Sequence, residues 1–582
     1  MSIKTITSND RIDIEHPFKI TAGPGAGKTH WLVNHIKHVL DNSKRLGCYR
    51  KVACITYTNT AVETIRGRLN YGAERVEVST IHSFIYYNII KPYMHFIAHQ
   101  YDFNVKYMDG HDDHFISRNY ITEWIDSHVN LNTLRTPYMR NQLLRMPSNL
   151  KALGNWLASI DFQFNGDNLE LTIDNSKAYD VETNTRLAKV ACLDKLVPGL
   201  LEYKKIFWRK GKLHHEDVLF FGYKLIIEYP FIITVLQAKF PYFFIDEFQD
   251  TNPVQTKILN LIAQKETIVG IIGDKAQAIY GFQGAASNDF DLFSLPGQQE
   301  YVIEDNRRST NLIIGLLNHL RKDITQNPIR NVPGSKPVLF VGTKELAFSY
   351  AQSVCGSESL ISLSRDNIMV NSMKRLYNTA IPTENLLDTL ITKDNSERVK
   401  VVVGCIKAVV LGLNKKFKEA INEMQKINKT VTDKSIKRKI SFHQLSLLLS
   451  KYESYKDDVL FAFYELVKTE INTSIPSLTR GAIKVFYESH TFSQIALFVD
   501  IKDEVSNCKT IHKAKGDEFD NVFVTMVATS DVGYLISPNL SVEEQRVRYV
   551  ALSRAKDRLF INVPNLSTSQ EEDLKSLFDI CR

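Results

Sequence analysis

The segment that most constrains the fold of this chain lies near its beginning, at residues 22–29. It follows the strand-type residues 18–22 and reads Ala22, Gly23, Pro24, Gly25, Ala26, Gly27, Lys28, Thr29. This spacing is typical of a phosphate loop between a strand and a helix, with Ala22 at the position of the first glycine. Backbone N–H groups of such a loop surround nucleotide phosphates, Lys28 would contact the β and γ oxygens, and the Thr29 hydroxyl would ligate Mg²⁺. We therefore expect a strand–loop–helix unit that binds a nucleotide.

Length and composition limit the class of protein. A chain of 582 residues is too long for one hydrophobic core, and 44% hydrophobic with 24% charged residues is ordinary for a globular protein. No apolar run is long enough to cross a membrane, and the first residues lack a signal-peptide pattern. Seven cysteines without a C-x-x-C pair argue against zinc and iron–sulfur sites and indicate a reducing, cytoplasmic location. The net charge of +7 permits a polyanionic partner.

Apolar, strand-type segments alternate with helical ones in two series. The first series comprises residues 18–22, 52–56, 76–78, 241–246 and 267–274, and the second comprises 301–303, 338–341, 360–363, 495–499, 521–524 and 558–562. Because this alternation is typical of parallel sheets buried on both faces, the fold class we expect is α/β with two such domains. The predicted first domain comprises 1–95 and 215–299, with a mainly helical insertion at 96–214 that shows no evident strand series. The second comprises 300–380 and 493–582, with a mainly helical insertion at 381–492.

Two predicted strands end in polar turns that suit phosphate chemistry. Asp246 and Glu247 follow the strand at 241–246, where Asp246 would hold Mg²⁺ and Glu247 would orient and deprotonate an attacking water. Gln277 lies in the turn after the strand at 267–274, and its amide could contact both a γ-phosphate and that water. Tyr280 and Phe282 follow in the same turn. They could pack in a core or stack on nucleic-acid bases.

Further motifs follow in a fixed order. They read Ile-Thr-Tyr-Thr-Asn-Thr-Ala at 55–61, Thr-Ile-His-Ser-Phe at 80–84, Asp-Asn-Arg-Arg-Ser at 305–309, Thr-Ile-His-Lys-Ala-Lys-Gly-Asp-Glu-Phe at 510–519 and Glu-Glu-Gln-Arg-Val-Arg-Tyr-Val-Ala-Leu-Ser-Arg-Ala-Lys at 543–556. With the segments above, this order resembles superfamily 1A DNA helicases of the UvrD/Rep/PcrA type over nearly the whole chain. The resemblance implies two RecA-like P-loop domains with parallel sheets, each carrying a helical insertion, and ATP with Mg²⁺ between them.

The resemblance also implies roles for individual residues. Arg308 and Arg554 would come from the second domain as arginine fingers that neutralise charge during phosphoryl transfer. Gly516 and Glu518 would contact the nucleotide, and Gln277 would couple the γ-phosphate to bound DNA. The residues expected along single-stranded DNA are Tyr57, Thr58, Asn59, His82, Tyr280, Phe282 and His512, although a lone histidine is more often structural.

The chain departs from the family pattern at several positions. Residues 1–30 contain no Gln to read adenine, and Arg307 replaces the aromatic residue that stacks on the base. Arg307 remains a candidate nucleotide contact because a guanidinium plane can stack as well, but the two changes leave the preferred base open. Gln283 replaces the usual Arg of the turn after Tyr280, and Asp517 replaces a Leu. The second insertion is shorter than in typical members. Its basic run at 415–439, with nine Lys or Arg against three Asp or Glu, favours a solvated helix face over a duplex-binding site.

Three functions remain in consideration. The leading hypothesis is an ATP-dependent helicase that moves 3′ to 5′ on single-stranded DNA, binds duplex/single-strand junctions and unwinds duplex DNA. The first alternative is a DNA-sensing or translocating NTPase subunit that serves a separate nuclease subunit in anti-phage defence, since no nuclease pattern follows Arg554. A nucleotide-dependent switch that needs no DNA is the third; Arg308 and Arg554 argue against it, because a simple switch requires neither.

Overall fold

The computed structural model describes the chain except for residues 1–2, 71, 113–117, 130–133, 135, 146, 181–184, 188–189, 265, 282–283, 285–287, 366–368, 371, 374–385, 395, 414, 429–430, 432, 497, 500–506 and 527–529. It divides into two compact units: Met1–Pro333 with Asn539–Tyr549, and Gly334–Pro538 with Val550–Arg582. Among the described residues no single helix could cross a membrane by length and composition; only α11 (His215–Glu228) and α12 (Phe231–Lys239), taken together across a 106° bend, meet those criteria.

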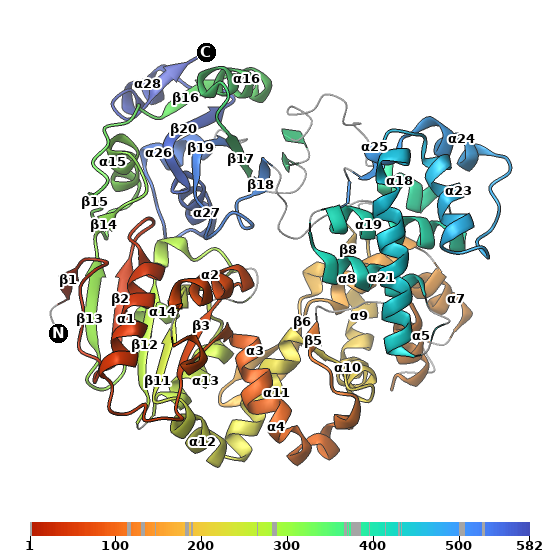
Figure 1. Cartoon of the computed structure of the whole chain (residues 1–582), viewed down its shortest axis with the longest axis horizontal. Helices are drawn as coiled ribbons and strands as arrows, with labels where there is room; N and C mark the ends of the chain where they lie inside the picture. The colour runs from red at the N-terminus through yellow and green to blue at the C-terminus, as the bar shows by residue number, and fades with distance from the viewer. Residues whose placement is uncertain are drawn as a thin grey trace. The chain divides into compact units, whose positions relative to one another are not determined.

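A sheet of seven parallel strands forms the centre of the first unit (Figure 1). Its strands, in spatial order, are β1 (Lys4–Ile6), β13 (Gln299–Ile303), β2 (Phe18–Ala22), β12 (Ile268–Gly273), β11 (Tyr242–Ile245), β3 (Val52–Thr56) and β4 (Val76–Thr80). All strands predicted in the first series are confirmed. Because β2, β12 and β11 are neighbours and run in the same direction, the segments that follow them start at one edge of the sheet.

Both faces of this sheet are buried, as the apolar strands predict. On one face, Ile20 and Phe244 pack in a core with α1 (Lys28–Asn42) and α2 (Asn59–Leu69). On the other face, Ile55 and Phe243 pack in a core with α3 (Ile81–Ile85), α11 and α13 (Pro253–Ile262). Successive strand residues alternate between the two faces, so a strand covered on both sides is apolar at most of its positions.

The predicted boundary at residue 300 is wrong. β13 pairs with β2 and β1 in the first sheet, and the first unit continues through α15 (Asn311–Leu320) to Pro333. Residues 539–549, expected in the second domain, also belong to the first unit. A sequence pattern identifies an apolar strand but not the sheet in which the strand pairs.

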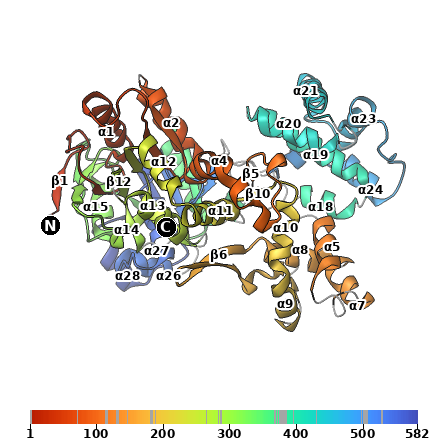
Figure 2. The same ribbon diagram turned by 90° about the horizontal axis from the view of Figure 1, so that it is seen from below.

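The insertion at 96–214 has its own core around Trp124, Trp156 and Tyr203. Its helices α5 (Arg118–Ser127), α8 (Pro147–Leu157), α9 (Val190–Leu196) and α10 (Leu200–Trp208) gather in one cluster (Figure 2). Contrary to expectation it also contains strands. β6 (Ile160–Asn165) and β7 (Asn168–Ile173) form an antiparallel hairpin, β8 (Tyr179–Asp180) pairs with β9 (Thr185–Arg186), and β5 (His111–Asp112) pairs with β10 (Leu213–His214). These strands are short or half-exposed, so they lack the continuous apolar runs of the central sheets.

The second unit contains a six-stranded parallel sheet. Its spatial order is β18 (Cys508–Thr510), β17 (Leu360–Ser364), β19 (Phe519–Thr525), β20 (Ala555–Val563), β16 (Val338–Val341) and β21 (Asp579–Cys581). Around it lie α16 (Lys344–Cys355), α26 (Ser530–Ile536) and α28 (Thr568–Leu574), while α27 (Glu543–Leu552) crosses the division between the units at Tyr549 and Val550. The α/β class with two parallel sheets is confirmed.

The second insertion is helical, as predicted. It comprises α18 (Leu386–Lys393), α19 (Glu397–Leu413), α20 (Phe417–Ile427), α21 (Lys434–Ser450), α22 (Tyr452–Tyr455), α23 (Leu460–Glu470), α24 (Ala482–Ser489) and α25 (Phe492–Ala496), which share one apolar core. The strand predicted at 495–499 is wrong, because α25 occupies Phe492–Ala496 and buries Ile495 in this core. A short apolar run alone does not distinguish a buried strand from a buried helix.

Candidate active site

The phosphate loop joins the end of β2 to the first turn of α1. Gly25 and Gly27 have φ angles of 73° and 82°, in the left-handed region that favours glycine. A Cβ atom on Gly25 would lie 2.6 Å from Asn306 Oδ1, so this position also needs glycine for space. No side chain caps the N-terminus of α1, and its first turn has no acidic residue. The N–H groups and the positive end of the helix dipole therefore suit an anion here.

Asp246 directly follows β11 and is buried, and its N–H donates to the carbonyl of Ile55 at 2.8 Å. Burial and the neighbouring Glu247 carboxylate raise the pKa of Asp246 to about 7, although Lys28 and a hydrogen bond with Thr29 act in the opposite direction. The paired oxygens of Thr29 and Asp246 form a donor set of the kind that Mg²⁺ prefers, and a cation there would favour the ionised carboxylate. The residues present fit a magnesium site.

Glu247 stands beside the lysine of the loop. Lys28 Nζ lies 3.5 Å from Glu247 Oε1 and 3.5 Å from the carbonyl oxygen of Ala22. Glu247 has a φ angle of 54°, which is strained for a residue with a side chain and is characteristic of functional sites. The Gln249 amide nitrogen donates to Glu247 Oε2 and so orients this carboxylate.

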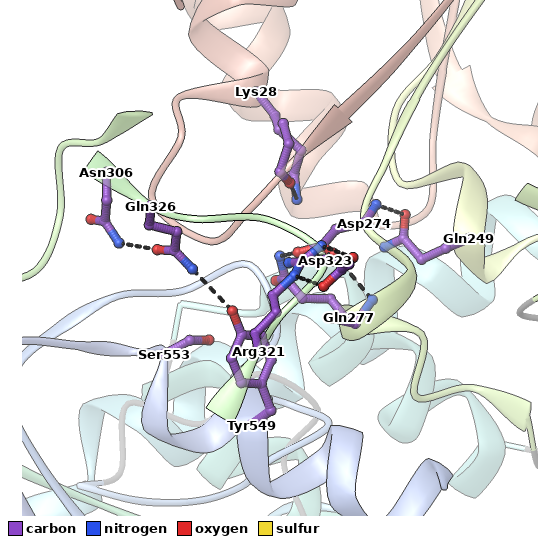
Figure 3. A network of polar contacts seen from close by, with 12 residues as sticks. Lys28, Gln249, Asp274, Gln277, Asn306, Arg321, Asp323, Gln326, Tyr549 and Ser553 are labelled. Atoms are coloured by element: carbon purple, nitrogen blue, oxygen red, sulfur yellow. Dashed lines mark hydrogen bonds and ion pairs between the residues drawn. The ribbon is translucent and has the colours of Figure 1, made fainter. Parts of the chain in front are cut away.

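Gln277 is linked to Gln249 and Glu247 by hydrogen bonds through Asp274, the residue after β12 (Figure 3). Gln277 Nε2 donates to Asp274 Oδ2 at 2.6 Å, and the Asp274 N–H donates to Gln249 Oε1 at 2.9 Å. A Cβ atom on Gly273 would lie 2.7 Å from Gln249 Oε1, so glycine permits this close approach. The turns after β11 and β12 therefore form one hydrogen-bonded group.

Arg307 and Arg308 adjoin the loop from the other side. The Arg307 N–H donates to the carbonyl of Gly25 at 2.9 Å, and its half-exposed guanidinium pairs with Asp305 at 2.9 Å. Asn306 Oδ1 accepts from the Arg308 N–H at 2.9 Å. Arg308 was expected in the second domain and instead belongs to the first unit, because β13 carries this segment into the first sheet.

The second unit brings together the other predicted nucleotide contacts. Arg554 is buried; its Nε donates to the Val550 carbonyl at 3.1 Å and its NH1 to the Asp517 carbonyl at 3.2 Å. It therefore holds the loop that contains Gly516, whose φ angle is 90°, and Glu518, which pairs with Lys556 at 3.4 Å. His512 lies half-buried in the same loop.

Of the residues expected along DNA, His512 belongs to the second unit, and those described in the first unit fall in two places. The Tyr57 and Tyr280 rings stack on each other with centroids 4.7 Å apart, and burial raises the pKa of both hydroxyls. Thr58 caps α2 by accepting from the Ala61 N–H at 3.2 Å, and exposed Asn59 begins that helix. Phe282 lies outside the described residues.

His82 belongs to a group of histidines. Its ring centroid lies 5.1 Å from that of His215 and 6.1 Å from that of His111, and burial lowers the pKa of His82 to about 3. His82 is therefore neutral at physiological pH. A neutral ring cannot form an ion pair with phosphate, so hydrogen bonding is the contact that His82 can offer to DNA.

Among the described residues, one group has metal-ligand spacing outside the predicted site: His214, Glu216 and Asp217. The ammonium of Lys204, fully buried, lies 2.9 Å from His214 Nδ1, 2.7 Å from Glu216 Oε1 and 2.8 Å from Asp217 Oδ1. This cation already occupies the position between the two carboxylates, so the group is a buried ion cluster.

The motif pattern gave no role to the polar residues that hold the site together: Gln249, Asp274, Asn306, Arg321, Gln326 and Tyr549. All are buried, and Asn306 and Tyr549 lie within the motifs at 305–309 and 543–556. Asp274 directly follows an apolar strand and Arg321 an apolar helix, and a lone polar residue at such a position is the signal that could have found these two.

Two family models match this sequence. Residues 7–296 match the UvrD/REP helicase N-terminal domain and residues 231–565 match the UvrD-like helicase C-terminal domain. The chain is 23% identical to the putative ATP-dependent DNA helicase YjcD of Bacillus subtilis, over 95% of this chain and 77% of that protein.

Two other relatives are matched over shorter regions. Over 55% of this chain, the sequence is 27% identical to the ATP-dependent DNA helicase PcrA of Leuconostoc citreum. Over 54% of this chain, it is 26% identical to Gabija protein GajB of Bacillus cereus. These matches cover 40% of PcrA and 48% of GajB, less than half of each relative. Two family domains that together span most of the sequence show that the chain belongs to the UvrD-like helicase family.

Proposed function

We propose that this protein is a DNA-dependent ATPase that moves along single-stranded DNA, in the 3′ to 5′ direction, and unwinds duplex DNA. The observation that carries the proposal is the group formed by Lys28, Thr29, Asp246 and Glu247 beside the uncapped start of α1. Family membership supports the use of ATP and DNA. The direction of movement rests on the family resemblance.

Each of these side chains has a chemical task in ATP hydrolysis. Lys28 and the N–H groups at the start of α1 bind the β- and γ-phosphate oxygens. Glu247 takes a proton from the attacking water as the bond between the γ-phosphorus and the bridging oxygen breaks. Thr29 and Asp246 would hold Mg²⁺, which would supply positive charge against the phosphates. Gln277 orients the water.

Lys28→Ala and Glu247→Gln test this assignment. Each should lower ATP turnover by about 10²-fold or more, because one removes phosphate binding and the other removes the base. Binding of a fluorescent single-stranded oligonucleotide, measured by anisotropy, should remain. The exposed residues Lys44 and Glu63 provide matched controls, Lys44→Ala and Glu63→Gln, which should behave as the wild type. Normal turnover in either site variant would exclude the assignment.

A second candidate keeps the ATPase but not the unwinding. The protein would be a DNA-sensing or translocating NTPase subunit that acts with a separate nuclease, and the similarity to Gabija protein GajB favours keeping this candidate. A strand-displacement assay with the purified protein separates the two. ATP-dependent unwinding by the protein alone supports the helicase, whereas DNA-stimulated hydrolysis without displacement supports the accessory role.

A further inference from the structure

Arg321, which lies outside the predicted motifs, is a buried cation directly after α15 in the first unit. Its side chain has no exposed area, and its NH1 lies 2.8 Å from Asp274 Oδ1. Nε and NH2 donate to the two carboxylate oxygens of Asp323 at 2.7 and 3.0 Å. Burial opposes the charge, but Asp274, Tyr549 and Asp323 raise the pKa of Arg321 well above its usual value. A buried charge with such partners has a fixed position, because breaking one ion pair would leave the other charge buried without a partner.

On one side, Arg321 fixes the residue that arranges the catalytic turns. Asp274 is buried without exposed side-chain area, and it accepts from Gln277 Nε2 at 2.6 Å and from the Ala276 N–H at 3.1 Å. Its own N–H holds Gln249, and Gln249 holds Glu247. The orientation of both the water-orienting amide and the proposed base therefore depends on Asp274.

On the other side, Arg321 adjoins the residues that support Arg308. Its guanidinium carbon lies 6.0 Å from the Tyr549 ring centroid, and the Tyr549 hydroxyl accepts from Gln326 Nε2 at 3.0 Å (Figure 3). Gln326 Oε1 accepts from Asn306 Nδ2 at 2.6 Å, and Asn306 Oδ1 accepts from the Arg308 N–H at 2.9 Å. The chain of contacts thus reaches the segment that adjoins the phosphate loop.

We infer that Arg321 is a positioning residue, which joins the turn carrying Gln277 and Glu247 to the segment carrying Arg308. This inference about Arg321 rests on the proposed ATPase function. Since Arg321 acts through Asp274 and Tyr549, its loss should disturb the alignment of the reacting groups more than nucleotide binding. The phosphate loop itself retains its backbone, Lys28 and Thr29.

The second insertion contains a matched control. Arg398 is also buried and donates to both oxygens of Asp394, from Nε at 2.8 Å and from NH2 at 3.0 Å. Its guanidinium carbon also lies 6.0 Å from a tyrosine ring, that of Tyr487, whose hydroxyl donates to Asp394 Oδ2 at 3.2 Å. A buried arginine with two contacts to one aspartate and a tyrosine ring nearby is therefore found both beside the motif residues and in a helical core.

Arg321→Gln and Arg398→Gln are compared in the full chain for DNA-stimulated ATP turnover and for melting temperature. Arg321→Gln should lower kcat by about tenfold to a hundredfold with little change in KM for ATP, since misplaced reacting groups have effects of this size. Arg398→Gln should lower the melting temperature by a comparable amount but leave kcat and the KM for ATP unchanged. Arg321→Lys, which retains the charge but not the two-pronged contact, should recover part of kcat.

Equal kcat in Arg321→Gln and Arg398→Gln, with an active wild type, overturns this inference and leaves the proposed function standing. A wild type that does not hydrolyse ATP overturns both. If Arg321→Gln does not fold, Tyr549→Phe is compared with Tyr487→Phe, since each removes one buried hydroxyl. A lower kcat in Tyr549→Phe alone supports the inference, and equal kcat in the two overturns it.

Discussion

At the scale of single residues, the stacked pair Tyr57 and Tyr280 gives the sharpest test of DNA contact. Tyr57→Ala should lower DNA affinity about tenfold, because stacking of a base on an aromatic ring contributes about 1–3 kcal/mol. It should reduce DNA-stimulated ATP turnover more than basal turnover, while Tyr57→Phe keeps the ring and should behave as the wild type. Anisotropy and steady-state hydrolysis measure the two effects; equal losses of basal and stimulated turnover would show that the ring is structural. The motif pattern predicted both tyrosines but not their contact, because they lie far apart in the sequence and meet only when β3 and β12 share a sheet. A contact within one loop, such as that of Lys28 with the Ala22 carbonyl, follows from local spacing and was predictable.

At the scale of elements, helix α1 makes the first unit sensitive to acid through His35. The His35 ring stacks on Trp31 with centroids 4.8 Å apart and also contacts Phe18, and burial lowers its pKa to about 3 from an ordinary 6.5. Between these values the unfolded chain binds a proton that the folded chain does not, so the free energy of unfolding falls as pH drops below 6.5, by about 1.4 kcal/mol per pH unit for this group. His35→Phe should keep the packing and make that slope shallower, as urea unfolding at pH 5, 6 and 7 would measure; identical slopes would contradict the burial argument. The central strands around α1 were predictable because burial on both faces demands continuous apolar runs. The same rule wrongly predicted a strand at 495–499, where a helix satisfies the same apolar pattern. It also failed to predict β6 and β7, because these strands are only half-buried and lack a continuous apolar run.

At the scale of the whole molecule, the resemblance to superfamily 1A helicases implies two arginine fingers, and these arginines belong to different units. Arg308 lies in the first unit and Arg554 in the second, and the chain passes from one unit to the other within α27. If both arginines serve one hydrolysis reaction, their effects on turnover should not multiply, because residues that act as a unit show strongly non-additive losses. We expect Arg308→Ala and Arg554→Ala each to lower kcat by about 10³-fold or more, and the double variant to lose little beyond the worse single one. Binding of a fluorescent nucleotide should persist in all three, which separates loss of chemistry from loss of the phosphate loop. Arg554 is buried, so melting temperatures must show that its variant remains folded; Arg558→Ala, which removes a half-exposed arginine from β20 in the same unit, is the matched control. Single effects that multiply in the double variant would mean that the two arginines act in independent steps, and the assignment of both to one phosphoryl transfer would then be wrong.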